Sequence, residues 1–155
     1  MTNEVPCRPI RSILIANRGE IALRIMRTAR RMGLETISVH SPADSAAPHV
    51  KFADRAVALT GSAAAESYLS IEQIIAAALE SNAQAIHPGY GFLSENPDFA
   101  KACKDAGLIF VGPGEHAIRT MGSKAAAKAL AEQAGIPCIP GFKGGDQSDD
   151  AFVKA

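Results

Sequence analysis

Residues 85–96 read Ala85-Ile86-His87-Pro88-Gly89-Tyr90-Gly91-Phe92-Leu93-Ser94-Glu95-Asn96. A short apolar strand ends at the His-Pro pair, two glycines flank an aromatic residue, and an Asn-Pro pair begins the next helix. Because Gly89 and Gly91 free the backbone on both sides of Tyr90, we expect its ring to stand out in a tight loop rather than pack in a core. Open α/β sheets place ligand chemistry in such loops, at the carboxyl ends of strands.

Strands and helices alternate along the rest of the chain. We expect strands at residues 13–16, 36–40, 56–59, 83–87 and 108–111, a loop at 41–48, and helices that begin near Glu20, Ile71, Pro97 and Ser123. The strands are apolar on both faces, which is typical of a parallel sheet covered on both sides. The expected fold is therefore α/β, a Rossmann-like parallel sheet with helices on both faces.

The composition excludes several classes of protein. The chain has 155 residues with a formal net charge of zero, so nothing in it suggests nucleic acid or an anionic membrane as a partner. The N-terminus has no signal-peptide pattern, and no apolar run approaches the ~18 residues of a membrane span. Three scattered cysteines, Cys7, Cys103 and Cys138, suggest reduced thiols and a cytoplasmic location. The last residues resemble the start of a helix, so we expect the front piece of a longer protein.

Two turns invite a phosphate-binding interpretation. Asn17-Arg18-Gly19-Glu20 follows the first strand but lacks the G-x-G-x-x-G fingerprint, so a tight turn at Gly19 is the structural alternative to an anion held by Arg18. Gly122-Ser123-Lys124 lacks the spacing of a phosphate loop. A lysine in the first helical turn opposes the helix dipole by roughly 0.3–1 kcal/mol, which an exposed side chain tolerates and a nearby polyphosphate would explain.

Other polar residues leave alternatives open. His87 is compatible with a base, a ligand or a hydrogen bond within its own loop, and no second His or Cys stands at metal-ligand spacing, so no metal site is expected. Glu95 is compatible with orienting a substrate or with capping the helix that begins at Pro97. The arginines of the first helix, Arg24, Arg27, Arg30 and Arg31, form a solvated or subunit-contacting face.

Three motifs in one order resemble the N-terminal domain of biotin carboxylase, the ATP-grasp enzyme of biotin-dependent carboxylases. They are residues 15–22, residues 87–96, and residues 121–124 followed by Ala134-Gly135-Ile136-Pro137. The resemblance implies an N-terminal tail at 1–11, the biotin carboxylase N-terminal domain at 12–141, and at 142–155 the start of a connection to an ATP-grasp domain.

The resemblance also implies a reaction and its cofactors. The family uses ATP, bicarbonate and Mg²⁺ (or Mn²⁺) to carboxylate biotin on a carrier protein. Lys124 matches a lysine that contacts the ATP phosphates, and Tyr90 and Gly91 match the loop beside biotin. His87 and Glu95 belong to the same motif.

Further expectations concern partners and assembly. Arg24 matches an arginine of the first helix near subunit contacts, and the resemblance implies an oligomer when full length, with a biotin carrier domain and a carboxyltransferase subunit as partners. The lid, the metal-binding glutamates and the catalytic base are expected beyond Ala155, so this chain alone should be inactive and hold no catalytic residue. Arg31 stands where the bacterial enzyme has an acidic dimer residue, which departs from that pattern. Residues 64–69 and 121–130 are more similar to acyl-CoA carboxylase α subunits, especially the 3-methylcrotonyl-CoA type, and a eukaryotic relative would lie in the mitochondrial matrix.

Two alternatives stay open from the residues alone. One is a nucleotide-dependent oxidoreductase domain on a similar sheet, against which the missing glycine fingerprint counts. The other is a non-enzymatic docking domain that binds partner subunits through its arginine-rich first helix.

Overall fold

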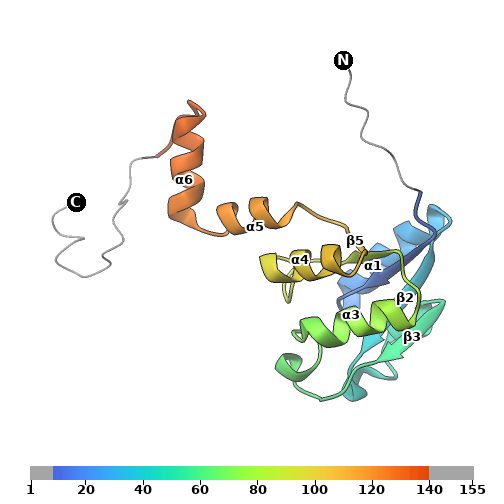
Figure 1. Ribbon diagram of the computed structural model, residues 1–155. Helices are drawn as coiled ribbons and strands as arrows, with labels where there is room; N and C mark the ends of the chain where they lie inside the picture. Colours follow the sequence, from blue (N-terminus) through green and yellow to red (C-terminus); the bar gives the residue numbers. More distant parts are fainter. Residues whose placement is uncertain (1–8, 140–155) are drawn as a thin grey trace. The chain divides into compact units, whose positions relative to one another are not determined.

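The computed structural model describes residues 9–139, which form two compact units, one running to Glu115 and one beginning at His116. The first unit is built on a parallel five-stranded sheet (Figure 1). Its strands are β1 (Ser12–Ile15), β2 (Glu35–His40), β3 (Arg55–Ala58), β4 (Ala85–His87) and β5 (Ile109–Phe110). Its helices are α1 (Gly19–Arg31), α2 (Pro48–Phe52), α3 (Ile71–Glu80) and α4 (Pro97–Asp105), with short 3₁₀ turns at Pro42–Asp44 and Ala64–Glu66. The boundary between the units falls after the first residue of α5 (Glu115–Met121), and the second unit holds the rest of this helix and α6 (Lys124–Gln133).

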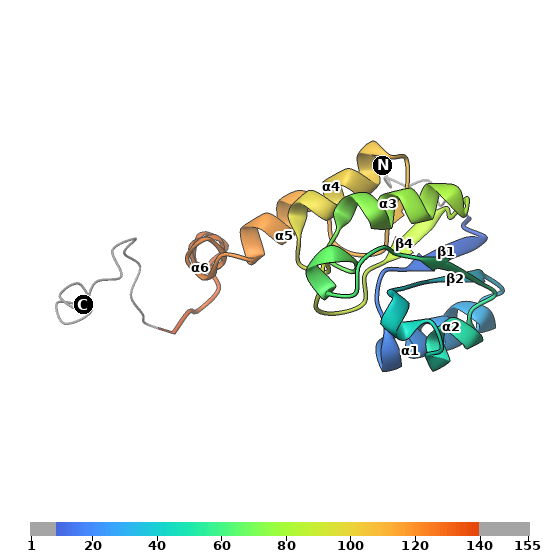
Figure 2. The ribbon, with the colours of Figure 1, turned by 90° about the horizontal axis from the view of Figure 1, so that it is seen from below.

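The sheet separates two apolar layers, which confirms the expected fold class. Along β1, Ile13 and Ile15 pack with the buried residues of α1, while Leu14 packs with those of α3 and α4 on the other face. Figure 2 shows α3 and α4 on one side of the sheet and α1 and α2 on the other. Because successive strand residues point to opposite faces, a sheet covered on both sides requires a strand buried along its whole length, as β1 is, with Ser12 its one polar residue.

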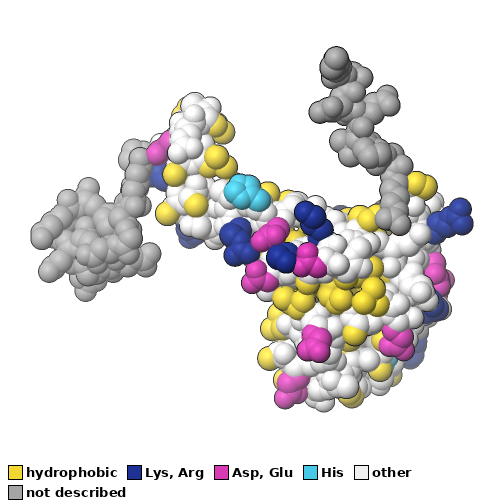
Figure 3. All heavy atoms as spheres, viewed as in Figure 1, with side chains coloured by type: hydrophobic (Ala, Val, Ile, Leu, Met, Phe, Trp, Pro, Cys, Tyr) yellow, Lys and Arg dark blue, Asp and Glu magenta, His cyan; other side chains and the backbone are white. Residues whose placement is uncertain are grey.

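The face covered by α3 and α4 is the one seen in Figure 3. Apolar side chains gather there over α3, whereas charged side chains of both signs stand together over α4. Lys101 and Asp105 form an ion pair on α4. Lys101 Nζ lies 2.5 Å from Asp105 Oδ2, and the two residues are one helical turn apart. Intermingled charges of this kind agree with a net charge of zero.

Local signals set the helix boundaries largely as the sequence predicts. The Asn96 side chain caps α4 by accepting from the backbone N–H groups of Asp98 and Phe99, with Pro97 at the first helical position. Gly33 follows α1 with a φ of +74°. The expected loop at 41–48 is partly wrong, because it contains a 3₁₀ turn and the first residue of α2, elements too short to show an apolar period.

The strand order positions the functional cleft. The order is β3-β2-β1-β4-β5, so the chain builds outward from β1 in one direction and then returns to build outward through β4 in the other. Within the sheet, β1 and β4 are neighbours, with Ile15 paired to His87 at their carboxyl ends. The connections leaving these two ends diverge, and such a switch point opens a crevice where α/β proteins bind ligands.

Among residues 9–139, no helix is both long and apolar enough to cross a membrane.

Candidate functional site

A cleft of about 360 Å³ lies where the chain leaves β1 and β4. One wall comes from the β1–α1 turn and the first turn of α1, and the other comes from the loop between β4 and α4. It is lined by Asn17, Arg18, Gly19, Glu20, Ile21, Tyr90, Gly91 and Phe92. The sequence motif that best predicts a ligand loop therefore faces the first strand-turn-helix of the chain.

Two glycines shape the loop for different reasons. Gly89 and Gly91 both have a φ of +69°, a conformation that side chains other than glycine rarely adopt. A Cβ atom at Gly89 would lie 2.8 Å from Asn17 Nδ2 and 3.2 Å from Ile21 Cγ1, whereas one at Gly91 would meet nothing within 4 Å. Gly89 thus allows close packing on the β1–α1 turn, and Gly91 leaves the backbone open beside Tyr90.

Tyr90 stands out from this loop, as predicted. Its side chain is 63% exposed, and its hydroxyl donates a hydrogen bond to Glu20 Oε2 at 3.0 Å. The hydrogen bond to the Glu20 carboxylate raises the pKa of Tyr90 above its ordinary value. A neutral aromatic ring held this way presents an apolar face to whatever enters the cleft.

The far end of the loop is braced by an aromatic stack. The Phe92 ring stacks on Tyr68 with 5.2 Å between centroids, and the Tyr68 hydroxyl donates to Asp44 Oδ2 at 2.6 Å. Arg18 donates to both oxygens of Asp44, each at 2.6 Å, and its guanidinium lies 5.9 Å from the Tyr68 ring centroid. Hydrogen bonding from Arg18 holds the pKa of Asp44 well below its usual range, so the carboxyl is ionised. The anion that Arg18 binds in this structure is therefore Asp44.

A buried histidine lies beneath the start of α1. The backbone N–H of Gly19 donates to Nδ1 of the fully buried His49 at 3.4 Å. Within residues 9–139, no group reaches Nε2 with acceptable hydrogen-bond geometry, although the Val39 carbonyl is close enough to raise the pKa in part. Burial outweighs this effect and lowers the pKa of His49, which keeps the ring neutral under the helix N-terminus.

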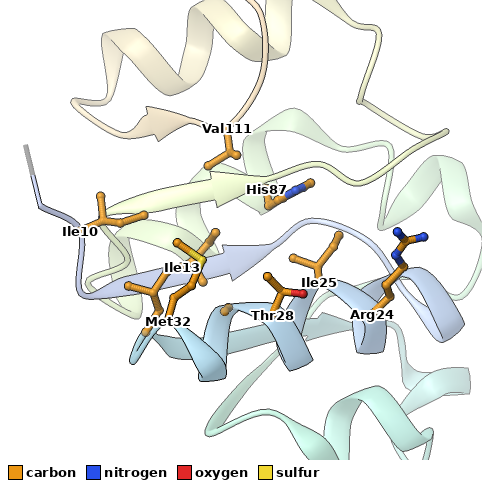
Figure 4. Close-up of a pocket in the computed structure, with 10 residues that line it drawn as sticks. Ile10, Ile13, Arg24, Ile25, Thr28, Met32, His87 and Val111 are labelled. Carbon is orange, nitrogen blue, oxygen red and sulfur yellow. The ribbon is translucent and has the colours of Figure 1, made fainter. Parts of the chain in front are cut away.

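A second cavity, of about 380 Å³, runs along α1 on the face of the sheet away from α3 and α4. It is mostly apolar and is lined by Ile10, Ile13, Arg24, Ile25, Thr28, Ala29, Met32, Leu34, His87 and Val111. Figure 4 shows Arg24 and His87 toward one end of this groove and Ile10 and Met32 toward the other.

The comparisons with known proteins identify the family. Residues 9–118 match the family model for the biotin carboxylase N-terminal domain. The chain belongs to this family. It is 53% identical over 148 residues to the mitochondrial methylcrotonoyl-CoA carboxylase subunit alpha of Dictyostelium discoideum, an alignment that covers 96% of this chain and 21% of that relative. It is 58% identical over 132 residues to the biotin carboxylase of a Nostoc species, which covers 85% of this chain and 30% of that relative.

A solved structure agrees with this assignment. The biotin carboxylase domain of Hydrogenobacter thermophilus 2-oxoglutarate carboxylase, a dimer in complex with MgADP, ADP and bicarbonate, superposes with a TM-score of 0.89 at 40% identity. The match covers 96% of this chain and 32% of that one. The biotin carboxylase N-terminal domain described here thus spans between a fifth and a third of the length of these relatives.

The structure places the predicted site residues of this biotin carboxylase domain in three different settings. Tyr90 and Gly91 line the cleft. His87 lines the groove instead, and its Nδ1 accepts from the N–H of Gly89 at 3.0 Å, which is the loop hydrogen bond that the sequence left open. Burial lowers the pKa of His87. Glu95 is exposed and does not cap α4, because Asn96 occupies that position.

Lys124 lies in the second unit of the domain. It is exposed and stands in the first turn of α6, where the Ser123 hydroxyl accepts from the N–H of Ala126 at 3.3 Å. Ser123 is therefore the N-cap of α6, in agreement with the expected helix start near this residue. Arg24, the predicted subunit contact, is exposed at the end of the groove.

Sequence reasoning missed the residues of this domain that hold the loop. Asn17 and Glu20 were assigned no role beyond a turn and a helix start, and Asp44 and Tyr68 were not singled out. Their partners lie between 24 and 73 residues away along the chain. A local sequence pattern cannot predict contacts over such distances. The one local signal for Asn17 is its position close to the end of a buried strand.

Proposed function

We propose that this chain is the N-terminal part of an ATP- and bicarbonate-dependent biotin carboxylase that carboxylates biotin on a carrier protein and supplies an acyl-CoA carboxylase. Membership of the family supports the reaction class, and the relatives that are methylcrotonoyl-CoA carboxylase subunits favour that acceptor type. The same membership weighs against a nucleotide-dependent oxidoreductase. The rest of the carboxylase, the carrier domain and a carboxyltransferase subunit are the proposed partners.

The observation that carries the proposal for this domain is the exposed Tyr90 ring. It stands at a cleft on the carboxyl side of the sheet, next to a glycine that leaves open space beside it. A neutral ring system such as the ureido bicycle of biotin suits contact with an aromatic face beside open backbone. We assign Tyr90 and Gly91 to the biotin side of the site, and we propose His87 and Glu95 of the same motif as further ligand-binding residues.

The ATP side of the proposed site rests on one residue of this chain. Lys124 is an exposed cation in a first helical turn, a position that suits contact with polyphosphate. Residues 9–139 contain no group of three acidic, His or Cys side chains that could hold a metal ion. We therefore place the ligands of Mg²⁺ or Mn²⁺ in the part of the relatives that this chain does not cover, where the metal would neutralise phosphate charge.

The assay separates the two halves of the reaction in the enzyme that contains this domain. Tyr90→Ala should raise the KM for biotin or its carrier, while bicarbonate-dependent ATP cleavage in the absence of biotin should stay near the wild-type rate. Equal losses in both activities, together with lower thermal stability, would show that Tyr90 is only scaffold. The isolated 155-residue chain should fold and show no turnover of ATP, bicarbonate and biotin.

The groove along α1 suits a contact with a partner subunit. Arg24 stands at the end of an apolar groove along α1, and we propose that it contacts another part of the assembled enzyme. Arg24→Glu should weaken assembly, measured by light scattering, more than it changes the KM for ATP. The Dictyostelium relative is mitochondrial by name, and for this protein we propose the cytoplasm or, in a eukaryotic cell, the mitochondrial matrix.

A further inference from the structure

The Asn17 side chain joins two segments that are about seventy residues apart in sequence. It is only 3% exposed and lies where the chain leaves β1. Its Nδ2 atom donates to the carbonyl oxygens of Pro88 and Tyr90, both at 2.8 Å. The side chain therefore bridges the β1–α1 turn to the loop that carries the exposed ring.

The two acceptors flank a glycine of that loop. Pro88 and Tyr90 stand on either side of Gly89, whose φ is +69°. By holding the carbonyls before and after this residue, one amide fixes the direction in which the chain enters and leaves the turn. The close approach of Gly89 to Asn17 Nδ2 shows that the amide packs directly against the turn it holds.

The chemistry of the contact requires an amide. Nδ2 uses both of its N–H groups on the two carbonyls, while Oδ1 accepts from the backbone N–H of Arg18 at 2.9 Å. Only this orientation of the amide gives each atom a partner of the right kind. An aspartate of the same shape would turn acceptors toward acceptors, and an alanine would leave one buried and one partly buried carbonyl without these donors.

The position of the Tyr90 ring depends on this backbone. Because the ring is mostly exposed, little packing holds it, and its described polar contact is the hydrogen bond to Glu20. Glu20 belongs to the same turn-helix segment as Asn17, so one short segment controls both the backbone and the hydroxyl of Tyr90.

We propose that Asn17 is the positioning residue that holds Tyr90 at the biotin side of the cleft, with Glu20 orienting the ring. This inference rests on the proposed function for the identity of the ligand, but the positioning itself does not. The Asn17 amide is occupied by backbone groups, and it acts on the ligand through the loop.

The first test is spectroscopic and needs no activity. The chain contains two tyrosines, Tyr68 and Tyr90, so incorporation of 3-fluorotyrosine should give two ¹⁹F resonances, assigned with Tyr68→Phe. Asn17→Ala and Asn17→Asp should each shift the Tyr90 resonance by more than that of Tyr68, whose ring stacks on Phe92 at the far end of the loop.

Ser81→Ala is the matched control. Ser81 is also buried, at 5% exposure, and its hydroxyl also contacts two carbonyl oxygens, those of Ala77 and Ala78, at 2.6 and 3.2 Å. It lies before β4, at the opposite edge of the sheet from the cleft. Its removal should therefore lower stability without shifting the Tyr90 resonance. An unshifted Tyr90 resonance in both Asn17 variants would overturn the inference.

The second test uses the enzyme that contains this domain. Asn17→Ala should lower kcat/KM for biotin by roughly tenfold or more, because misplacement by about 1 Å can cost on the order of a hundredfold. The KM for ATP and the biotin-independent cleavage of ATP should change by less than about twofold, as should every activity of Ser81→Ala. Equal loss of both activities in Asn17→Ala would mean general unfolding and would overturn the positioning role.

The two tests separate this inference from the proposed function. A shifted Tyr90 resonance with an unchanged kcat/KM for biotin would support positioning of the loop and overturn the assignment of Tyr90 to biotin. The variant Glu20→Gln keeps an acceptor for the Tyr90 hydroxyl and should retain most of the biotin activity that Glu20→Ala loses. Loss of equal size in both Glu20 variants would overturn the orienting role of this side chain.

Discussion

Gly89 and Gly91 offer an internal comparison, because they share a φ of +69° and differ in their surroundings. An alanine at either position would have to adopt the left-handed conformation, at a cost of roughly 1–2 kcal/mol. It would also restrict the unfolded chain, which favours folding by about 0.4–1 kcal/mol. The net expectation for Gly91→Ala is therefore a loss of about 1 kcal/mol in the free energy of unfolding.

Gly89→Ala should cost more because its new Cβ has no room. That atom would lie 2.8 Å from Asn17 Nδ2, too close for the amide to keep its place. Displacing the amide weakens two hydrogen bonds to buried or half-buried carbonyls, each with a net value of roughly 0.5–1.5 kcal/mol. We expect a total loss of about 2–4 kcal/mol, so the two variants should differ by about 1–3 kcal/mol.

Urea unfolding followed by tyrosine fluorescence measures this difference. The chain has no tryptophan, and both of its tyrosines lie in the first unit, so the signal reports on that unit alone. Equal losses for the two variants, or a larger loss for Gly91→Ala, would refute the close approach of Gly89 to Asn17. Asn17→Ala/Gly89→Ala gives a further check, because removing the amide should relieve most of the clash.

Three further outcomes follow from buried and exposed ionisable groups. Burial raises the pKa of the fully buried Cys103 thiol to about 12, so iodoacetamide at about pH 8 should modify Cys103 only after unfolding. Peptide mass spectrometry measures the modification, and a modified Cys103 in native protein would contradict this expectation. Burial lowers the pKa of His49 below its ordinary 6.5, so the folded protein binds a proton at His49 less readily than the unfolded chain does. The neutral ring therefore contributes its full stability above pH 6.5, and this stability is lost as the pH falls from 6.5 toward the lowered pKa. The free energy of unfolding should fall there by up to about 1.4 kcal/mol per pH unit, and a His49→Gln variant with an equally steep profile would exclude this source. In the enzyme that contains this domain, Lys124→Ala should weaken ATP binding by roughly 1.5–3 kcal/mol with little change in Tm, and an unchanged KM for ATP with a much lower Tm would indicate a structural role instead.

Sequence patterns predicted the sheet because its signals are local. The apolar run of β1, the Asn-Pro start of α4 and the glycine after α1 each act within a few residues, and all three appear where expected. The outward position of Tyr90 was also predictable, because glycines on both sides leave its backbone no regular structure to join. The helix α2 was not predicted, since five residues contain too little of a helical period.

The candidate site was only half predictable, for a reason of topology. The Tyr90 loop is encoded in one stretch, but the groups that hold it come from Asn17 and Glu20 after β1, and from Asp44 and Tyr68 after β2 and β3. A parallel sheet brings the carboxyl ends of its strands to one edge, so segments distant in sequence meet there as a consequence of strand order. Strand order is not written in any single motif.

Because strand order brings several segments to the loop, the loop is held in place at both of its ends. Hydrogen bonds from the Asn17 side chain to backbone carbonyls hold one side of the turn, and the Phe92–Tyr68 stack holds the other, so Tyr90 lies between two fixed points. A ligand that meets a loop already fixed at both ends loses little conformational freedom of the protein on binding. The Asp44–Arg18 pair ties the second brace back to the turn that carries the first, so the two supports belong to one connected network. Weakening either support should therefore change the position of the exposed Tyr90 ring more than it changes the packing of the core.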